Sequence, residues 1–210
     1  MQPKKITEIF KRLKTERPAP RSELIFKTPY ELLVAVMLSA QATDASVNKA
    51  TEKLFPVANT PQAFVAMGVD TLKGYIKTIN LYPTKAKNIV KMSEILLNKF
   101  DGQVPDNRDD LVSLPGVGRK TANVVLNTAF NQDIIAVDTH IFRVANRTGI
   151  APGKEVLAVE TKLLEVVPKA FLKDAHHWLL LHGRYVCKAR GYNCATCPIS
   201  DLCEFPDKTA

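Results

Sequence analysis

The chain has 210 residues, of which 46% are hydrophobic and 24% are charged. This composition is ordinary for a globular protein of one or two domains, and it excludes a disordered, collagen-like or coiled-coil chain. Lysine and arginine outnumber aspartate and glutamate by 29 to 21, which gives a net charge of +8 and favours a polyanionic partner such as nucleic acid.

Helix start signals recur along the chain. Thr28-Pro29 and Thr60-Pro61 each combine an N-cap with a proline at the first helical position. The apolar residues 134–137 have no partner strand and predict an extended connector. The expected helices, ten in all, cover about 28–40 and 44–55, begin at 60 and at Asp70, and then cover 84–100, 107–113, 119–130, 138–146, 154–167 and 174–186. The sequence therefore predicts an all-α fold.

The sequence shows neither a membrane span nor a signal peptide. The densest apolar run, Leu32 to Leu38, has seven residues, far fewer than the ~18–20 that a bilayer requires. Charged residues are spread through positions 1–18, so no uncharged central segment exists there. We expect a cytoplasmic protein in a reducing compartment, and a monomer, because nothing in the pattern indicates oligomerisation.

A glycine-containing turn, Leu114-Pro115-Gly116-Val117-Gly118, joins two expected helices and predicts a helix–hairpin–helix. Gly116 and Gly118 allow the main chain to take unusual geometries and to approach a ligand closely. The first amides of the next helix lack partners and lie at the positive end of its dipole, which suits a DNA phosphate. The alternative is an ordinary tight turn without a ligand.

Lys120 lies in the first turn of the helix that follows this hairpin. The helix dipole disfavours a cation there by ~0.3–1 kcal/mol. A residue that departs from such a local preference often has a function. The dipole lowers the pKa of a lysine only modestly, so a nucleophilic Lys120 also needs desolvation or a base. Asp138 is a candidate base but is equally a good helix N-cap. Alternatively, Lys120 simply pairs with a phosphate.

All four cysteines lie within the last 24 residues, at Cys187, Cys194, Cys197 and Cys203. In a reducing compartment such a cluster favours metal ligation over disulfides. Structural zinc sites usually contain two close cysteine pairs, whereas only the middle two are close here. The spacing of six, two and five intervening residues favours a [4Fe-4S] cluster, with zinc as the alternative.

Together these features resemble the endonuclease III family of DNA glycosylases. The resemblance is carried by residues 38–44, the hairpin with its lysine at 114–120, residues 137–140 and the spacing of the four cysteines. It implies two helical domains: a six-helix barrel over residues 22–132 containing the hairpin, and an iron–sulfur domain formed by residues 1–21 and 133–210. A DNA-binding groove is expected between the two domains.

The resemblance also implies an activity. A bifunctional base-excision-repair glycosylase and AP lyase would act on double-stranded DNA that contains damaged pyrimidines or abasic sites. Such an enzyme would be cytoplasmic and associated with the nucleoid. It implies that Lys120 attacks C1′, expels the oxidised base and forms a Schiff base that permits β-elimination. Asp138 is expected to activate the lysine or to stabilise positive charge on the sugar.

The damaged base has to leave the helical stack before it can react. Gln41 and Leu81 resemble the family's residues that fill the vacated space, and His140 resembles a residue lining the lesion pocket. Alternatively, Gln41 caps the next helix, Leu81 is a core residue, and His140 forms a hydrogen bond to a helix terminus. Pro83 departs from the family pattern, which has a polar residue there, and would stiffen the loop around Leu81.

Backbone contacts with DNA are expected from two places. The hairpin residues Leu114, Gly116 and Gly118 would bind one stretch of phosphates. Lys188 and Arg190, between the first two cysteines, would bind another, so that the cluster has a positioning role. Alternatively, these two cations are solvated surface charges.

Three other functions stay open at this point. An adenine-removing glycosylase of the same superfamily shares the cluster and hairpin, but it lacks a lysine at position 120 and has an additional C-terminal domain. A non-catalytic hairpin-and-cluster module would bind DNA without cleaving it. A small iron–sulfur electron carrier would leave the hairpin and the basic charge unexplained.

Overall fold

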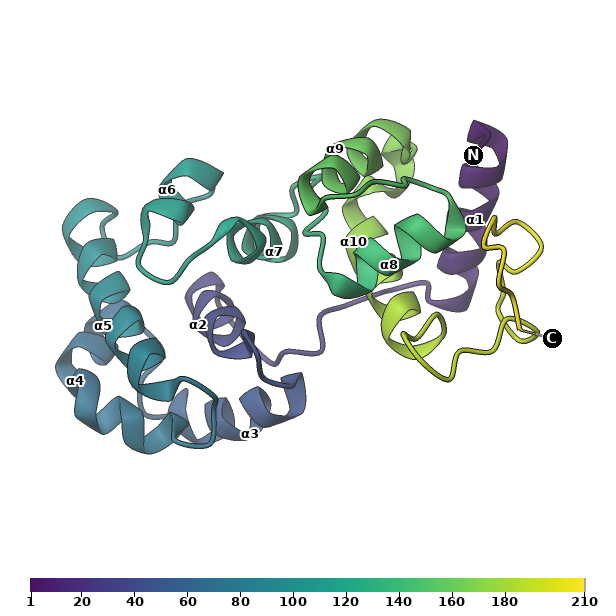
Figure 1. Ribbon diagram of the computed structural model, residues 1–210. Helices are drawn as coiled ribbons and strands as arrows, with labels where there is room; N and C mark the ends of the chain where they lie inside the picture. Colours follow the sequence, from purple (N-terminus) through teal and green to yellow (C-terminus); the bar gives the residue numbers. More distant parts are fainter. Residues whose placement is uncertain (210) are drawn as a thin grey trace. The chain divides into compact units, whose positions relative to one another are not determined.

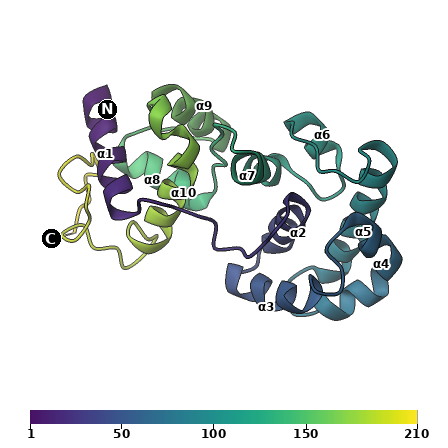
Figure 2. The ribbon, with the colours of Figure 1, turned by 180° about the vertical axis from the view of Figure 1, so that it is seen from behind.

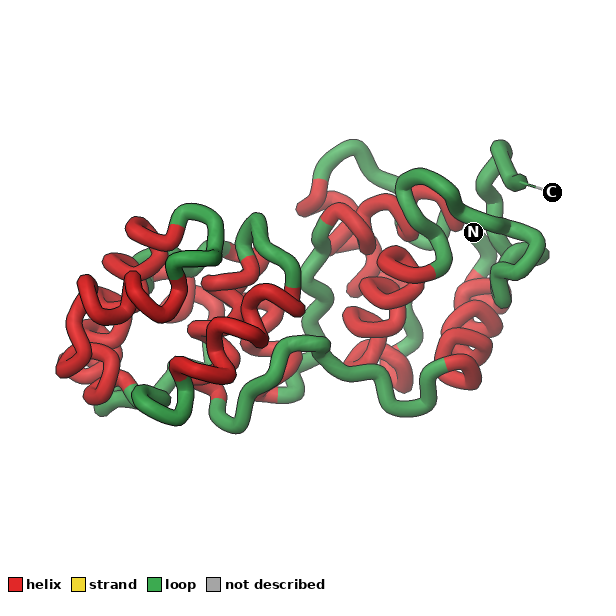
Figure 3. The backbone as a smooth tube through the Cα atoms, turned by 90° about the horizontal axis from the view of Figure 1, so that it is seen from below, coloured by secondary structure: helices red, strands yellow, loops and turns green. Residues whose placement is uncertain are grey.

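The computed structural model describes residues 1–209, and every regular element in that range is a helix (Figures 1 and 3). The helices are α1 (Pro3–Glu16), α2 (Pro29–Ser39), α3 (Asp44–Leu54), α4 (Pro61–Ile76), α5 (Tyr82–Lys99), α6 (Arg108–Ser113), α7 (Arg119–Phe130), α8 (Thr139–Thr148), α9 (Val156–Val166) and α10 (Lys169–Tyr185). The all-α prediction is confirmed. Within residues 1–209, no helix has the length and apolar character that crossing a membrane would require.

The chain divides into two compact units. The middle unit runs from Ser22 to Phe130 and contains α2–α7. The terminal unit joins residues 1–21 to the chain from Asn131 onwards and contains α1 and α8–α10. Each unit has its own core and is described separately.

Helix α2 is the central element of the middle unit. Every residue from Tyr30 to Leu38 is buried, and α3, α5 and α7 pack against this helix. The buried Tyr30 hydroxyl lies 2.7 Å from the Ser93 hydroxyl of α5, and burial raises the pKa of Tyr30. α4 and α5 lie side by side along their lengths (Figure 1).

The helix starts of the middle unit follow local chemistry. The hydroxyl oxygens of Thr28, Thr43 and Thr60 accept hydrogen bonds from the amides of residues 31, 46 and 63, which are otherwise unpaired at a helix start. The proline at the first position of α2 and α4 has no amide to satisfy there. The caps inferred at Thr28 and Thr60 are confirmed.

The division of the 60–76 segment differs from the prediction. The break lies at Gly68 (φ +73°, ψ 167°) rather than at Asp70, and α4 continues on both sides of it. Glycine adopts a positive φ without steric cost, so the chain bends there. The Asp70 carboxylate does not cap a helix but accepts a hydrogen bond from Lys73 Nζ at 2.8 Å.

Helix α1 of the terminal unit was not predicted, because the many charges of this segment conceal its apolar stripe. Ile6, Ile9, Phe10 and Leu13 recur at helical spacing and are all buried. The Phe10 ring packs against the rings of Phe171 and Trp178, at centroid distances of 5.8 and 6.3 Å. These contacts hold the first helix beside α10, as Figures 1 and 2 show from opposite sides.

The connector before α8 is extended, as predicted, and is part of the terminal core. Ile135 and Val137 are buried in the same cluster as the α1 stripe. No strand pairs with this connector within residues 1–209. Its apolar character therefore reflects packing against helices rather than sheet formation.

Candidate DNA-binding and catalytic residues

The segment between α6 and α7 forms the predicted hairpin. Leu114 and Val117 point into the core, at 2% and 5% exposed, and the Val117 amide donates to the Leu114 carbonyl at 3.1 Å. Gly116 has a φ of +79°, and a Cβ there would lie 2.9 Å from Asn88 Nδ2 and 3.0 Å from Met37 Cε. Glycine adopts this positive φ without strain, and the side chains of Asn88 and Met37 leave little space for a Cβ. With its side chain buried, Leu114 can contact DNA only through its main chain.

Gly118 and Lys120 lie on the exposed side of the hairpin. Among residues 1–209, no atom would come within 4 Å of a Cβ placed on Gly118, so the main chain is open to a ligand there. The Gly118 carbonyl accepts from the Ala122 amide at 2.9 Å and so begins α7. Lys120, the second residue of α7, is exposed, and the first turn of this helix contains no acidic residue. Lys120 therefore lies in the first turn of a helix, as the sequence predicts.

Asp138 belongs to the terminal unit, whereas Lys120 belongs to the middle unit. The Asp138 side chain is half-buried and caps α8, with Oδ1 accepting from the Ile141 amide at 2.8 Å. The capping role considered from the sequence is therefore present. The cap uses one of the two carboxylate oxygens.

His140 is half-buried two residues after this cap. Its Nδ1 lies 3.2 Å from an Arg143 guanidinium nitrogen, and its Cβ would be 2.9 Å from any Cβ placed on Gly183 of α10. The same arginine donates to the carbonyls of Gly183 and Cys187, at 2.7 and 2.9 Å. Burial lowers the pKa of Arg143. Arg143 thus connects His140 to the first cysteine, a link that the sequence did not indicate.

Gln41 and Leu81 both occupy turns and are exposed, Leu81 at 60%. Gln41 does not cap α3, because Thr43 does so, and Leu81 is not a core residue. Both alternatives to a role in DNA binding are therefore wrong. Pro83 lies in the first turn of α5, where a missing amide costs no hydrogen bond, so it stiffens the helix start next to Leu81.

The four cysteines all line one pocket of the terminal unit. All four are free thiols and partly exposed. Within residues 1–209, no three histidine, cysteine or acidic side chains converge closely enough to ligate a single metal ion. His182 Nε2 lies 3.8 Å from Cys197 Sγ, and burial lowers the pKa of this histidine to about 4.

Arg147 supports the first cysteine loop from α8. Its guanidinium lies over the rings of Tyr192 and Phe205, at 4.4 and 4.8 Å from their centroids. It also donates to the Lys188 carbonyl at 2.7 Å and to Cys187 Sγ at 3.6 Å. The side chains of Lys188 and Arg190 themselves are exposed. The sequence does not single out Arg147, because nothing local distinguishes it from another charge near the end of a helix.

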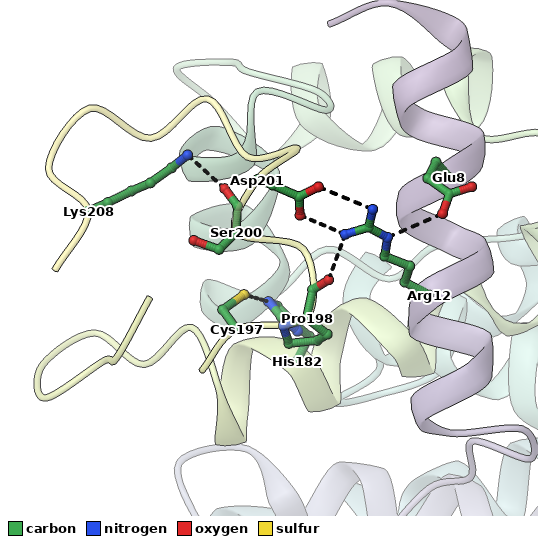
Figure 4. A network of polar contacts seen from close by, with 8 residues as sticks. All are labelled: Glu8, Arg12, His182, Cys197, Pro198, Ser200, Asp201 and Lys208. Carbon is green, nitrogen blue, oxygen red and sulfur yellow. Dashed lines mark hydrogen bonds and ion pairs between the residues drawn. The ribbon is translucent and has the colours of Figure 1, made fainter. Parts of the chain in front are cut away.

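A second arginine ties the cysteine segment to the N-terminal helix (Figure 4). Arg12 of α1 forms a bidentate ion pair with Asp201, at 2.6 and 3.1 Å, and donates to the Pro198 carbonyl at 3.1 Å. Lys208 Nζ closes the same region by donating to the Ser200 carbonyl at 2.7 Å. The beginning and the end of the chain are therefore joined next to Cys197 and Cys203.

The Arg12–Asp201 pair should make the stability of the terminal unit depend on pH. Arg12 lowers the pKa of Asp201 below its ordinary value, so the stabilisation is complete above the unfolded pKa of ~3.9 and is lost as pH falls through the lower folded value. We expect Asp201→Asn to unfold at a slightly lower temperature than the wild type at pH 7, with the difference shrinking below about pH 4. Thermal unfolding followed from pH 7 to 3 measures this. Asp207→Asn, which lies outside the network, is the control, and a difference that does not vary with pH would contradict the assignment.

Comparison with known proteins assigns the family. The family model described as "HhH-GPD superfamily base excision DNA repair protein" matches residues 34–169. Endonuclease III of Haemophilus influenzae is 61% identical over 208 residues, which cover 99% of each chain. The chain belongs to the endonuclease III family of this superfamily. As a member, it is a DNA glycosylase and AP lyase of base excision repair that binds DNA, as the sequence predicts.

Solved structures agree with this membership. A non-covalent endonuclease III–DNA complex superposes with a TM-score of 0.91 at 43% identity, covering 97% of this chain and 96% of that chain. A trapped covalent endonuclease III–DNA intermediate gives a TM-score of 0.90 at the same identity and coverage. These matches favour the endonuclease III family over the adenine glycosylase, the non-catalytic module and the electron carrier.

Proposed function

We propose that this family member removes oxidised pyrimidines from double-stranded DNA and then nicks the strand by β-elimination, with Lys120 as the nucleophile. The observation that carries the proposal is the exposed Lys120 amine in the first turn of α7, two residues after the open main chain of Gly118. An amine there lies beside the amides that would hold a DNA phosphate. We expect the protein to act as a monomer in nucleoid-associated cytoplasm.

The proposed reaction starts from a neutral Lys120 amine. Its nitrogen attacks C1′, the bond from C1′ to the base breaks, and the base leaves with the electron pair and takes up a proton. The nitrogen gives up a proton, the C1′–O4′ bond breaks as O4′ takes up a proton, and the nitrogen lone pair forms an iminium between Lys120 and C1′. A C2′ proton is then removed, its electron pair forms the C2′–C3′ double bond, and the C3′–O bond breaks to release the 3′ phosphate. Water hydrolyses the imine and frees the lysine.

Asp138 is proposed as the carboxylate of this reaction. Its cap bond to Ile141 fixes the side chain through Oδ1, so that a charged group is held in one orientation without further ordering. A carboxylate so held stabilises positive charge that develops on the sugar, or takes a proton from the lysine. His140, packed on Gly183 and held by Arg143, is proposed to line the lesion pocket.

DNA is proposed to bind through exposed groups of both units. The main chain of Leu114, Gly116 and Gly118 would contact phosphates in the middle unit, and Gln41 and Leu81 would fill the space left by the extruded base. Lys188 and Arg190 would contact phosphates in the terminal unit. We propose that the middle unit is the six-helix barrel domain and that the terminal unit is the cluster domain.

The cysteine pocket is proposed to hold a [4Fe-4S] cluster through Cys187, Cys194, Cys197 and Cys203. All four thiols line one pocket, and their spacing of six, two and five intervening residues supports a polynuclear cluster rather than zinc. The Arg147 guanidinium near Cys187 suits a thiolate. When bound, the cluster would cross-link the end of α10 to the C-terminal segment.

The cluster assignment has a direct test. The purified protein is expected to absorb near roughly 400 nm and to contain iron rather than zinc. Treatment with a chelator and an oxidant should bleach this absorption and loosen the segment that carries Lys188 and Arg190. Weaker DNA binding would follow, because the positions of these cations depend on the cysteines. Stoichiometric zinc in a colourless protein would contradict the proposal.

Borohydride reduction tests the proposed reaction as a whole. Incubated with a duplex that bears thymine glycol or an abasic site, the wild-type protein should become covalently joined to the DNA, because borohydride reduces the iminium to a stable amine. An unmodified duplex is the control and should trap nothing. A wild-type protein that cuts the damaged strand without ever being trapped would rule out the lysine mechanism.

A further inference from the structure

The two residues proposed to fill the vacated stack lie at equivalent positions of two turns, which we call the Gln41 turn (residues 39–42) and the Leu81 turn (residues 79–82). Each turn is closed by a hydrogen bond from its fourth amide to its first carbonyl, at 3.0 and 3.2 Å. Gln41 and Leu81 are third in their turns, with φ values of +57° and +58°.

Positive φ at the third position is normally supplied by glycine or asparagine. A glutamine and a leucine are strained in this conformation, and strained residues persist where the surrounding structure holds them. The backbone of both turns therefore has to be held in this conformation by contacts with the rest of the middle unit. The structure shows these contacts.

Lys85 supplies the main support for the Gln41 turn. This residue lies one helical turn after Leu81 in α5 and is 8% exposed. Its Nζ donates to the carbonyls of Leu38 and Ala40, at 2.7 and 2.6 Å. These carbonyls lie at the end of α2, where they lack helical partners and where the helix dipole favours a cation.

Two further contacts extend this arrangement along α5. Just before the helix, Asn80 Nδ2 donates to the Gln41 carbonyl at 3.0 Å. One turn beyond Lys85, Asn88 packs so closely on the hairpin that a Cβ on Gly116 would lie 2.9 Å from its Nδ2. Leu81, Lys85 and Asn88 are four and three residues apart, so they share one face of the helix.

A buried ammonium group is an unusual choice for packing alone. Burial lowers the pKa of Lys85, because the loss of hydration disfavours its charged form. A methionine would fill similar space without this desolvation, but it could not bind the two carbonyls. The ammonium group of Lys85 therefore serves to position the Gln41 turn rather than to fill space.

We propose that the first two turns of α5 hold the Gln41 turn, the Leu81 turn and the hairpin in register, and that Lys85 is the positioning residue that joins the two turns. This inference rests on the proposed roles of Gln41 and Leu81. Filling one gap in a base stack from two sides requires their tips to keep a fixed separation, because contacts of this kind tolerate displacements of only about 0.5 Å. Lys85 fixes that separation without touching DNA.

The test compares two substrates with Lys85→Met, which keeps the length of the side chain but removes the hydrogen bonds. Excision of thymine glycol from a fully paired duplex should fall about tenfold or more, because a misplaced side chain extrudes the base poorly. Strand cleavage and borohydride trapping at a preformed abasic site should change less than about threefold, because no base has to be extruded. Lys91→Met, at an exposed position of the same helix, is the matched control.

Additional variants separate positioning from folding. Lys85→Arg keeps the cation and its donors and should recover most of the excision activity. Asn80→Ala removes a surface hydrogen bond to Gln41, so it should show the same substrate selectivity more weakly in a fully folded protein. Loss of both activities in equal proportion, or of neither, would overturn the positioning role.

A failure of the underlying roles would look different. The double variant Gln41→Ala/Leu81→Ala should lose excision from paired DNA by a larger factor than abasic-site cleavage, and Lys85→Met should add little to this loss because all three residues act as a unit. A double variant with wild-type excision would show that the two tips do not fill the stack. A wild type that is never trapped would instead contradict the proposed reaction.

Discussion

Lys120→Gln is expected to abolish borohydride trapping and to reduce strand cleavage at an abasic site by about 10³-fold or more, because glutamine cannot form an imine. Lys120 is exposed, so the change removes no packing. It also removes a cation from a helix N-terminus, where the dipole disfavours it by ~0.3–1 kcal/mol. The variant should therefore unfold at the same temperature as the wild type or slightly above it, while binding abasic DNA.

Arg119→Gln is the control for this experiment. It removes the neighbouring positive charge from the same helical turn and leaves the amine in place. We expect DNA binding to be weaker and to depend less steeply on salt concentration. Trapping at saturating protein concentration should be undiminished. If Lys120→Gln were still trapped, another amine would be the nucleophile and the hairpin would serve only to bind DNA.

Asp138→Asn is expected to lower base excision by about 100-fold or more, within the range for loss of a proton-transferring or charge-stabilising group. Asparagine is as good an N-cap as aspartate, so the bond from the Ile141 amide should persist and stability should change little. The measurements are single-turnover excision from a thymine glycol duplex and thermal unfolding of the same samples.

Asp138→Ala separates the two roles of this side chain. It should lose the same activity as the asparagine variant and, in addition, about 1 kcal/mol of stability because α8 loses its cap. An asparagine variant with full activity would show that Asp138 is a structural cap only. An alanine variant that is inactive merely because it is unfolded would be recognised from its unfolding curve.

The sequence was informative where the decisive physics is local. A hydroxyl at Thr28 or Thr60 binds an amide three residues away, so the caps of α2 and α4 were predictable. The hairpin was predictable for a similar reason, because Gly116 allows a positive φ. Helix α1 was missed because its many charges conceal the apolar stripe, and the break was assigned to Asp70 although Gly68 is the residue that adopts the positive φ.

The candidate site divides in the same way. The chemical groups, Lys120, Asp138 and the four cysteines, were identifiable because each lies in a short pattern of defined spacing. The residues that hold the cysteine segment and the Gln41 turn were not identifiable, because Arg12, Arg147 and Lys85 look like ordinary surface charges in the sequence.

The sequence by itself determined that the chain is helical, which residues are candidates for the reactive groups, and which family it resembles, since these follow from neighbours a few residues apart. The tertiary structure alone decided which charges hold the Gln41 turn and the cysteine segment in place. Lys85 binds a carbonyl 47 positions away, and Arg12 binds Asp201 across 189 positions. No periodicity encodes such bonds, because they depend on which helix faces meet once the apolar stripes are buried.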